Sequence, residues 1–202
     1  MAIANYTDLQ NSVASWLNRS DLAALIPDFI TLAEAKLNGD LENVRSMESK
    51  TTLSTTNNVA TVTLPSDMLE MKRLVVVDSY DTVLKYLSPD ELAADYADNQ
   101  TGRPVVFTVS GSTIELAPIP DGVYSLELTY FQKVPALSAS NTTNWLLSAW
   151  PNAYLYGALC AAQPYLMNDA RLPVFQQMYQ DAVDGINAID WYSGSTMRVK
   201  AR

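Results

Sequence analysis

Three pairs of aspartates are the side chains in this sequence whose types and spacing most resemble a catalytic arrangement. The pairs are Asp78 with Asp81, Asp95 with Asp98 and Asp181 with Asp184. On a helix this spacing places both groups on one face. Paired carboxylates can bind Mg²⁺ or act as acid and base in glycoside cleavage. A solvated acidic face explains the same spacing more simply, and it is the interpretation we prefer.

Glu34 is the single acid that stands out, because it lies between two alanines in an apolar stretch. A half-buried carboxylate at this position needs a partner. We expect it to pair with Arg19, Lys36 or Arg45, and we favour this structural role over catalysis.

Other routes to catalysis are excluded by composition. The 202 residues contain no histidine, which excludes Ser-His-Asp and Cys-His catalysis and most zinc sites. The seven glycines form neither a phosphate-binding loop nor a dinucleotide fingerprint. Cys160, the single cysteine, lies in an apolar run and is expected to be a buried hydrophobe, the alternative being a reactive thiol. We therefore predict no enzyme, no catalytic residue, no cofactor and no metal site.

Charge argues against nucleic-acid binding. Thirteen basic residues face 22 acidic ones, for a net charge of −9, so the overall field repels DNA. The aromatic residues of 144–167 have no basic residue among them, which favours packing in a core or subunit interface over base stacking.

The sequence has no run of the roughly 18 apolar residues that a membrane span needs. Residues 1–6 lack the basic and apolar regions of a signal peptide. We expect a protein without a membrane partner that is made and folded in a cytosol.

Helices are predicted at both ends of the chain from apolar residues three and four apart. The first begins at a cap, Asn5 or Thr7, and ends near Asn18. A short turn capped by Ser20 follows, and then a helix from Pro27 to about Val44. Near the other end, 144–167 is predicted helical with breaks at Pro151 and Pro164. A last helix spans 169–189, with the apolar stripe Val174, Phe175, Met178, Ala182, Val183, Ile186 and Ile189.

The middle of the chain is rich in β-formers separated by turn residues. Strands are predicted within 51–55, 59–64, 69–77, 82–87, 105–109, 113–116 and 124–131. A short helix capped by Ser88 is predicted to end near Asn99. These short strands are typical of a small antiparallel sandwich or barrel.

The predicted fold class is therefore α+β. A helical bundle is built from both chain ends, residues 1–45 and 141–190. A small antiparallel β domain, residues 46–140, is inserted into it, and residues 191–202 form an extended C-terminal arm.

Several blocks of the chain, in order, carry a family resemblance. They are 18–22 with 26–30 and 32–38, Leu64–Glu70, Thr101–Pro104, Leu116–Pro120, Leu128–Phe131 with Val134–Ser138, and Asn144–Leu147 with Pro151–Leu159. Together they resemble the head-to-tail adaptor (connector) proteins of short-tailed bacteriophages, the tail-accessory and tail tubular protein A-like proteins.

The resemblance implies a structural protein of the virion, made in the cytoplasm of a bacterial host and located at the head–tail junction. It implies a ring, typically dodecameric, beneath the portal protein, with the tail nozzle on its other side. Genomic double-stranded DNA would pass through the ring without specific binding. It implies no catalytic residue.

The C-terminal arm is the segment that we expect to bind the portal. Trp191 and Tyr192 would anchor it, and Arg198, Lys200 and Arg202 would bind an acidic groove. A solvated tail and a DNA contact are the alternatives for these basic residues.

Two other functions stay open at this point. One is a cell-wall hydrolase carried on the virion that uses paired carboxylates. The other is a different head-completion or tail-tube subunit. We expect the free protein to be monomeric, because its net charge opposes self-association.

Overall fold

A computed structural model describes residues 3–42, 44–97, 100–166 and 171–189. The chain divides into two compact units. Residues 1–46 and 134–202 belong to the first, which we call the helical unit, and residues 47–133 to the second, the β unit. The mixed α+β class predicted from the sequence is confirmed.

The helical unit begins with α1 (Tyr6–Leu17), whose cap is Asn5: its side chain accepts a hydrogen bond from the Asp8 N–H. A 3₁₀ segment, η1 (Ser20–Leu25), leads into α2 (Ile26–Asp40), which has Pro27 in its first turn. The prediction that this helix reaches Val44 is wrong. Leu41 is already extended, and it and Val44 are buried. Gly39 weakens the last turn, so burial of these two side chains decides where the helix ends.

Three helical segments form the C-terminal part of this unit before its last helix. They are α4 (Trp145–Ala149), α5 (Pro151–Ala161) and the 3₁₀ segment η3 (Gln163–Tyr165). The predicted interruptions at Pro151 and Pro164 are confirmed. The last helix, α6, spans Leu172–Ile189, and residues 167–170 before it lie outside the described part of the chain.

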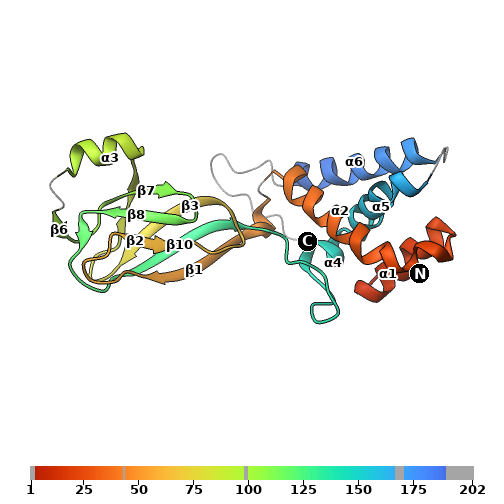
Figure 1. Cartoon of the computed structure of the whole chain (residues 1–202), viewed down its shortest axis with the longest axis horizontal. Coiled ribbons are helices and arrows are strands. Elements are labelled where there is room, and N and C mark those ends of the chain that lie inside the picture. Colours follow the sequence, from red (N-terminus) through yellow and green to blue (C-terminus); the bar gives the residue numbers. More distant parts are fainter. Residues whose placement is uncertain (1–2, 43, 98–99, 167–170, 190–202) are drawn as a thin grey trace. The chain divides into compact units, whose positions relative to one another are not determined.

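Helix α5 packs against α1, α2 and α6, and it runs between the last two (Figure 1). Gly157 permits this close approach. A Cβ there would lie 3.1 Å from the Cβ of Ala33 and 3.3 Å from the ring of Tyr179. The largest fully buried side chains of the unit come from four helices: Leu9, Phe29, Ile30, Leu37, Tyr154 and Tyr179.

Two four-stranded sheets make up most of the β unit (Figure 1). The first has the order β1 (Glu48–Ser54), β10 (Ser125–Gln132), β3 (Met68–Val77) and β4 (Thr82–Val83). The second has the order β2 (Thr61–Thr63), β8 (Thr113–Ala117), β7 (Val106–Ser110) and β5 (Lys85–Tyr86). The β7–β8 hairpin turns at Gly111, whose φ of 59° is a conformation that glycine adopts without strain.

The strands pair antiparallel, as predicted, except in two short pairs. Strand β5 runs parallel to β7, and β6 (Thr101–Gly102) runs parallel to β9 (Ile119–Pro120). The predicted strand at 82–87 is two strands, because the chain leaves the first sheet at the buried Leu84 and enters the second.

The β core lies between the two sheets, so the sandwich is the one of the two predicted arrangements that forms. Apolar side chains from both sheets form one cluster: Val62, Leu64, Leu74, Val76, Leu84, Phe107, Ile114, Leu116, Leu126, Leu128 and Tyr130. Helix α3 (Pro89–Asp95) starts with the predicted Ser88 cap, completed by Glu91 as a capping box, but it ends before the predicted Asn99. Its Leu92 packs with Val106 and Ala117 in a separate small cluster.

Candidate interaction surfaces and the buried polar network

The residues that we predicted to bind the portal are Trp191, Tyr192, Arg198, Lys200 and Arg202. All five lie outside the described part of the chain. Their role therefore stays a prediction, and the candidate sites below come from the described residues.

Glu34 lies in the interior of the helical unit, with 6% of its surface exposed. Its Oε1 accepts a hydrogen bond of 2.7 Å from the Leu137 N–H and one of 3.3 Å from the Tyr154 hydroxyl. The predicted ion pair with Arg19, Lys36 or Arg45 is wrong: among the described residues Glu34 forms no salt bridge. Arg19 instead binds Asp21, and Lys36 lies over the ring of Tyr179. The partners of Glu34 are a backbone N–H and a phenol, which no local pattern of charges could reveal.

Asn144 completes this network. Its side-chain N–H₂ donates to the Pro135 carbonyl and to the Tyr154 hydroxyl, at 2.7 and 2.6 Å. Its Oδ1 accepts from the Leu147 N–H and so caps α4. A second side-chain amide also binds the backbone of this segment: Asn38 Oδ1 accepts a hydrogen bond of 2.8 Å from the Val134 N–H. The network therefore fastens the returning segment at 134–144 to α2 and α5.

Burial raises the pKa of Glu34, and the hydrogen bonds from Leu137 and Tyr154 only partly oppose the shift. Burial also raises the pKa of Tyr154, so its hydroxyl keeps its proton and acts as a donor. A raised carboxyl pKa is also a property of general acids. Here, however, the carboxylate oxygen is engaged by the fold itself, and its role is structural.

The paired aspartates lie on the surface wherever the structure describes them. Asp181 and Asp184 accept hydrogen bonds from Gln177 and Gln180 on the exposed surface of α6. Asp78, Asp81 and Asp95 are exposed. Asp98, the partner of Asp95, lies outside the described residues. Over the part of the chain that the structure describes, no group of three or more potential ligand residues could hold a metal ion.

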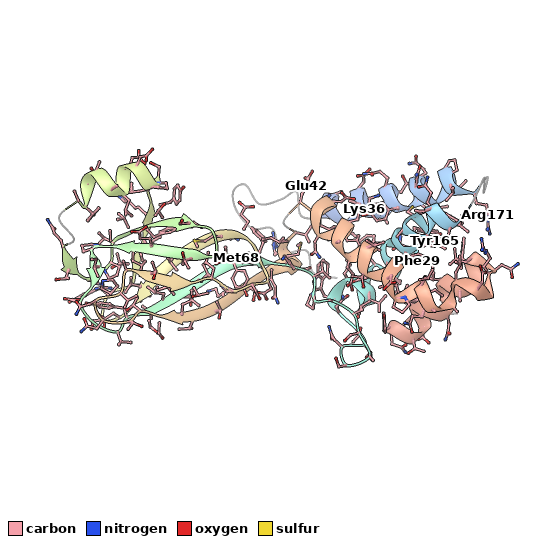
Figure 2. The ribbon with its side chains drawn as sticks, viewed as in Figure 1. Phe29, Lys36, Glu42, Met68, Tyr165 and Arg171 are labelled. Atoms are coloured by element: carbon pink, nitrogen blue, oxygen red, sulfur yellow. The ribbon has the colours of Figure 1, made fainter. Side chains whose placement is uncertain are left out.

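Tyr179 forms a smaller polar cluster on α6. Its hydroxyl donates to Asp40 Oδ2 at 2.8 Å, and Lys36 Nζ lies 4.2 Å from the centre of its ring. Burial and the neighbouring carboxylate raise the pKa of Tyr179. Lys36, which is labelled on α2 in Figure 2, lines a groove between α2, α5 and α6. The groove has a volume of about 380 Å³.

Some aromatic residues of the C-terminal helices are buried in the core, and others are exposed at the surface. Tyr154 is buried, as expected for core packing, whereas Tyr165 is exposed and packs beside Phe29 with ring centres 5.3 Å apart (Figure 2). Trp16, Tyr156 and Phe175 form a second group, with centres 5.9 to 6.5 Å apart. Cys160, which we predicted to be buried, is only half-buried. This partial burial raises the pKa of its thiol, which disfavours the reactive thiolate.

The predicted apolar stripe of α6 is not buried throughout. Phe175, Ala182, Val183 and Ile186 face the core, but Val174 and Met178 are 53% and 44% exposed. Leu32 on α2 is also exposed, at 57%. Where such exposed apolar side chains lie together in one patch, they mark a candidate contact with a partner protein.

No helix in the described ranges has both the length and the apolar character needed to cross a bilayer. The chain matches the family model described as SU10 adaptor protein over residues 4–200, which includes both units. No curated protein matches the chain. An adaptor family indicates a structural role in a bacteriophage virion, and to this extent the resemblance found in the sequence is confirmed. The chain belongs to the SU10 adaptor protein family.

Proposed function

We propose that this protein is the head-to-tail adaptor of a short-tailed bacteriophage, of the tail tubular protein A-like kind. Copies of the helical unit form a dodecameric ring beneath the portal protein, and the ring connects the portal to the tail nozzle. The observation that carries the proposal is the family match, which runs through the helical unit, the inserted β unit and back again.

The charge of the chain supports a place beside the genome during ejection. The chain carries a net charge of −9 and has a pI of about 4.4. An acidic wall repels the phosphate backbone, so DNA can move past it without binding. We propose that the ring forms part of this channel.

The surface of the helical unit supports a subunit that contacts neighbours. Exposed apolar side chains occur on α1, α2 and α6, and only 17% of all residues are charged. Interfaces are depleted in charge and enriched in aromatic residues and methionine. Trp16 and Met178, both exposed, have this character.

The C-terminal arm is the proposed portal contact. Trp191 and Tyr192 anchor it, and the basic residues Arg198, Lys200 and Arg202 bind an acidic groove of the portal. A segment that orders on its partner gains contact area at an entropic cost, which favours a few strong anchors of this kind.

Binding to the purified portal of the same phage tests the proposal. The full-length chain is expected to form a stable complex with several copies per portal ring, measured by mass photometry. A variant that ends at residue 190 is expected to keep its fold, by circular dichroism, and to lose portal binding. Equal binding by both forms would refute the role of the arm.

The same preparations separate an adaptor from a hydrolase. Protein that clears bacterial cell wall in a gel assay, and loses this activity on an Asp181→Asn change, would contradict a purely structural role. We expect no clearing by either form.

A further inference from the structure

The groove of the helical unit presents apolar and cationic groups together. It is lined on three sides by side chains of α2, α5 and α6, among them Leu32, Lys36, Cys160, Gln176 and Gln180. Its volume of about 380 Å³ has room for one or two side chains of a partner. Lys36, the cation at this groove, forms no salt bridge within the described residues.

A different surface lies on the other flank of α6. Val174 and Met178 each stand two positions from the groove residues Gln176 and Gln180. At about 100° per residue, two positions turn the helix by roughly 200°, which places these side chains on opposite sides. The Arg171 guanidinium, one turn before Val174, donates to the Trp16 carbonyl. Trp16 is 42% exposed, so it adds apolar area beside this flank.

The two surfaces differ in charge as well as position. Helix α6 contains no basic residue between 172 and 189, and Asp181 follows Met178 by one turn. Asp181 accepts a hydrogen bond from Gln177 and, within the described residues, has no cationic partner. The groove therefore combines apolar side chains with Lys36. The opposite surface, which we call the α6 ridge, combines the apolar Val174 and Met178 with Asp181.

We infer that the groove of one copy receives the α6 ridge of a second copy. Met178 enters the groove between Leu32 and Cys160, and Asp181 approaches Lys36. Methionine suits such a contact, because its flexible side chain fills irregular gaps. The inference rests on the proposed ring and names the contact that builds it.

A contact of this kind joins copies head to tail. Each copy keeps a free groove and a free ridge on opposite flanks, so two copies cannot satisfy both contacts at once. Such heterologous interfaces form closed rings or open filaments, whereas a self-complementary patch stops at a dimer. The contact therefore propagates from copy to copy, as a ring of identical subunits requires.

Cysteine cross-linking on the portal tests the contact, because Cys160 lines the groove and is the single cysteine. A Met178→Cys variant of the full-length chain is mixed with the purified portal and oxidised with diamide, which takes up the two protons and two electrons. The reaction is run at mildly alkaline pH, because burial raises the pKa of Cys160. The expected product is a ladder of disulfide-linked chains that extends beyond the dimer.

Two matched variants control the experiment. Met178→Cys combined with Cys160→Ser retains one thiol and should give no ladder. Val123→Cys places a thiol on the β unit, where Val123 is 76% exposed, and should give dimers at most. A ladder that appears equally with Val123→Cys would show random collision and would overturn the inference.

Charge reversal supplies a second measurement. Lys36→Glu or Asp181→Lys alone is expected to lower the ladder yield about fivefold, and the double reversal to restore it to within about twofold. Many copies on the portal without a disulfide between Cys160 and the thiol introduced by Met178→Cys would overturn the contact and leave the adaptor role intact. No assembly on the portal at all would refute both.

Discussion

The two units of this protein bury different kinds of side chain. The core of the β unit is one apolar cluster between two sheets, and Tyr130 is the only buried member of that cluster with a polar atom in its side chain. Among the described residues of the β unit, the buried polar ones are threonines, namely Thr55, Thr108 and Thr129. The helical unit buries a carboxyl group, an amide and a phenol that bond to one another and to the backbone.

The difference reflects how each unit is held in register. In a sandwich, strand pairing and alternation of side chains fix the arrangement, because a slip of one residue would expose the core face. Helices can slide and rotate more freely, and a satisfied polar network specifies one arrangement. In the helical unit this network also fastens the segment that returns from the β unit.

The largest expected effect tests whether the two cores are independent. Leu126 in the β unit and Leu37 in the helical unit are both fully buried leucines. Replacing either by alanine should cost about 2–5 kcal/mol of stability. Hydrogen exchange should then rise across β1, β3 and β10 for Leu126→Ala, and across α2 and α5 for Leu37→Ala.

Equal loss of protection in both units from either change would contradict separate cores. The protection pattern of the wild-type chain under the same conditions is the reference for both variants.

The polar network is tested by two substitutions of Glu34. Glu34→Ala leaves the buried Leu137 N–H without an acceptor and should cost about 1–3 kcal/mol. Glu34→Gln keeps an acceptor oxygen and should cost far less at neutral pH. Urea denaturation of both variants measures the difference, and equal losses would show that the hydrogen bond to Leu137 contributes little.

The same residue gives the stability of the wild-type chain a dependence on pH. Burial raises the folded-state pKa of Glu34 above its ordinary value of 4.5, so the folded state binds the proton more tightly than the unfolded state. The contribution of this group is therefore present below about pH 4.5 and is lost as the pH rises through the folded-state pKa. Relative to wild type, Glu34→Gln should gain stability across that rise. A constant difference would contradict the shift.

A pair of glycines tests how tightly the helices pack. Gly157→Ala introduces a Cβ 3.1 Å from Ala33 and should lower stability by about 1 kcal/mol. A Cβ added at Gly39 in α2 would meet no neighbouring group within 4 Å outside the backbone of its own helix. Gly39→Ala should therefore raise stability by about 0.5–1 kcal/mol. Thermal melting that moves both variants in the same direction would contradict the close approach at Gly157.

The most local expected effect concerns α3, the one α-helix of the β unit among the described residues. Ser88→Ala removes the cap that bonds to the Glu91 N–H and should cost about 1 kcal/mol locally. Amide exchange should increase in residues 89–95 and remain unchanged in the helical unit. Unchanged exchange in α3 would show that packing of Leu92 alone maintains the helix.

Features fixed by a few neighbouring residues could be predicted from the sequence. The caps at Asn5 and Ser88 and the breaks at Pro151 and Pro164 depend on local conformational preferences. Where distant parts of the chain decide the outcome, prediction failed. Glu34 and Leu137 are 103 positions apart in sequence. The chain passes from the first sheet to the second at Leu84, and this passage depends on the pairing of β5 with β7.

The exposed ridge of α6 was missed for a similar reason. Val174 and Met178 fit the helical period of the core stripe, and periodicity alone assigns them to the interior. Their exposure follows from where α5 packs against α6, which no single-helix pattern contains. The sequence signal that would have separated them is their place at the edge of the stripe, next to Gln177 and Asp181.

The central claim is that this protein forms a ring at the head–tail junction. Symmetry-resolved imaging of the virion, with the protein identified by a bound antibody fragment, tests it most directly. The account predicts antibody density at the junction, arranged as one ring of many copies directly below the portal. Label on the capsid surface or at the tail tip, or a single copy at the junction, would contradict it.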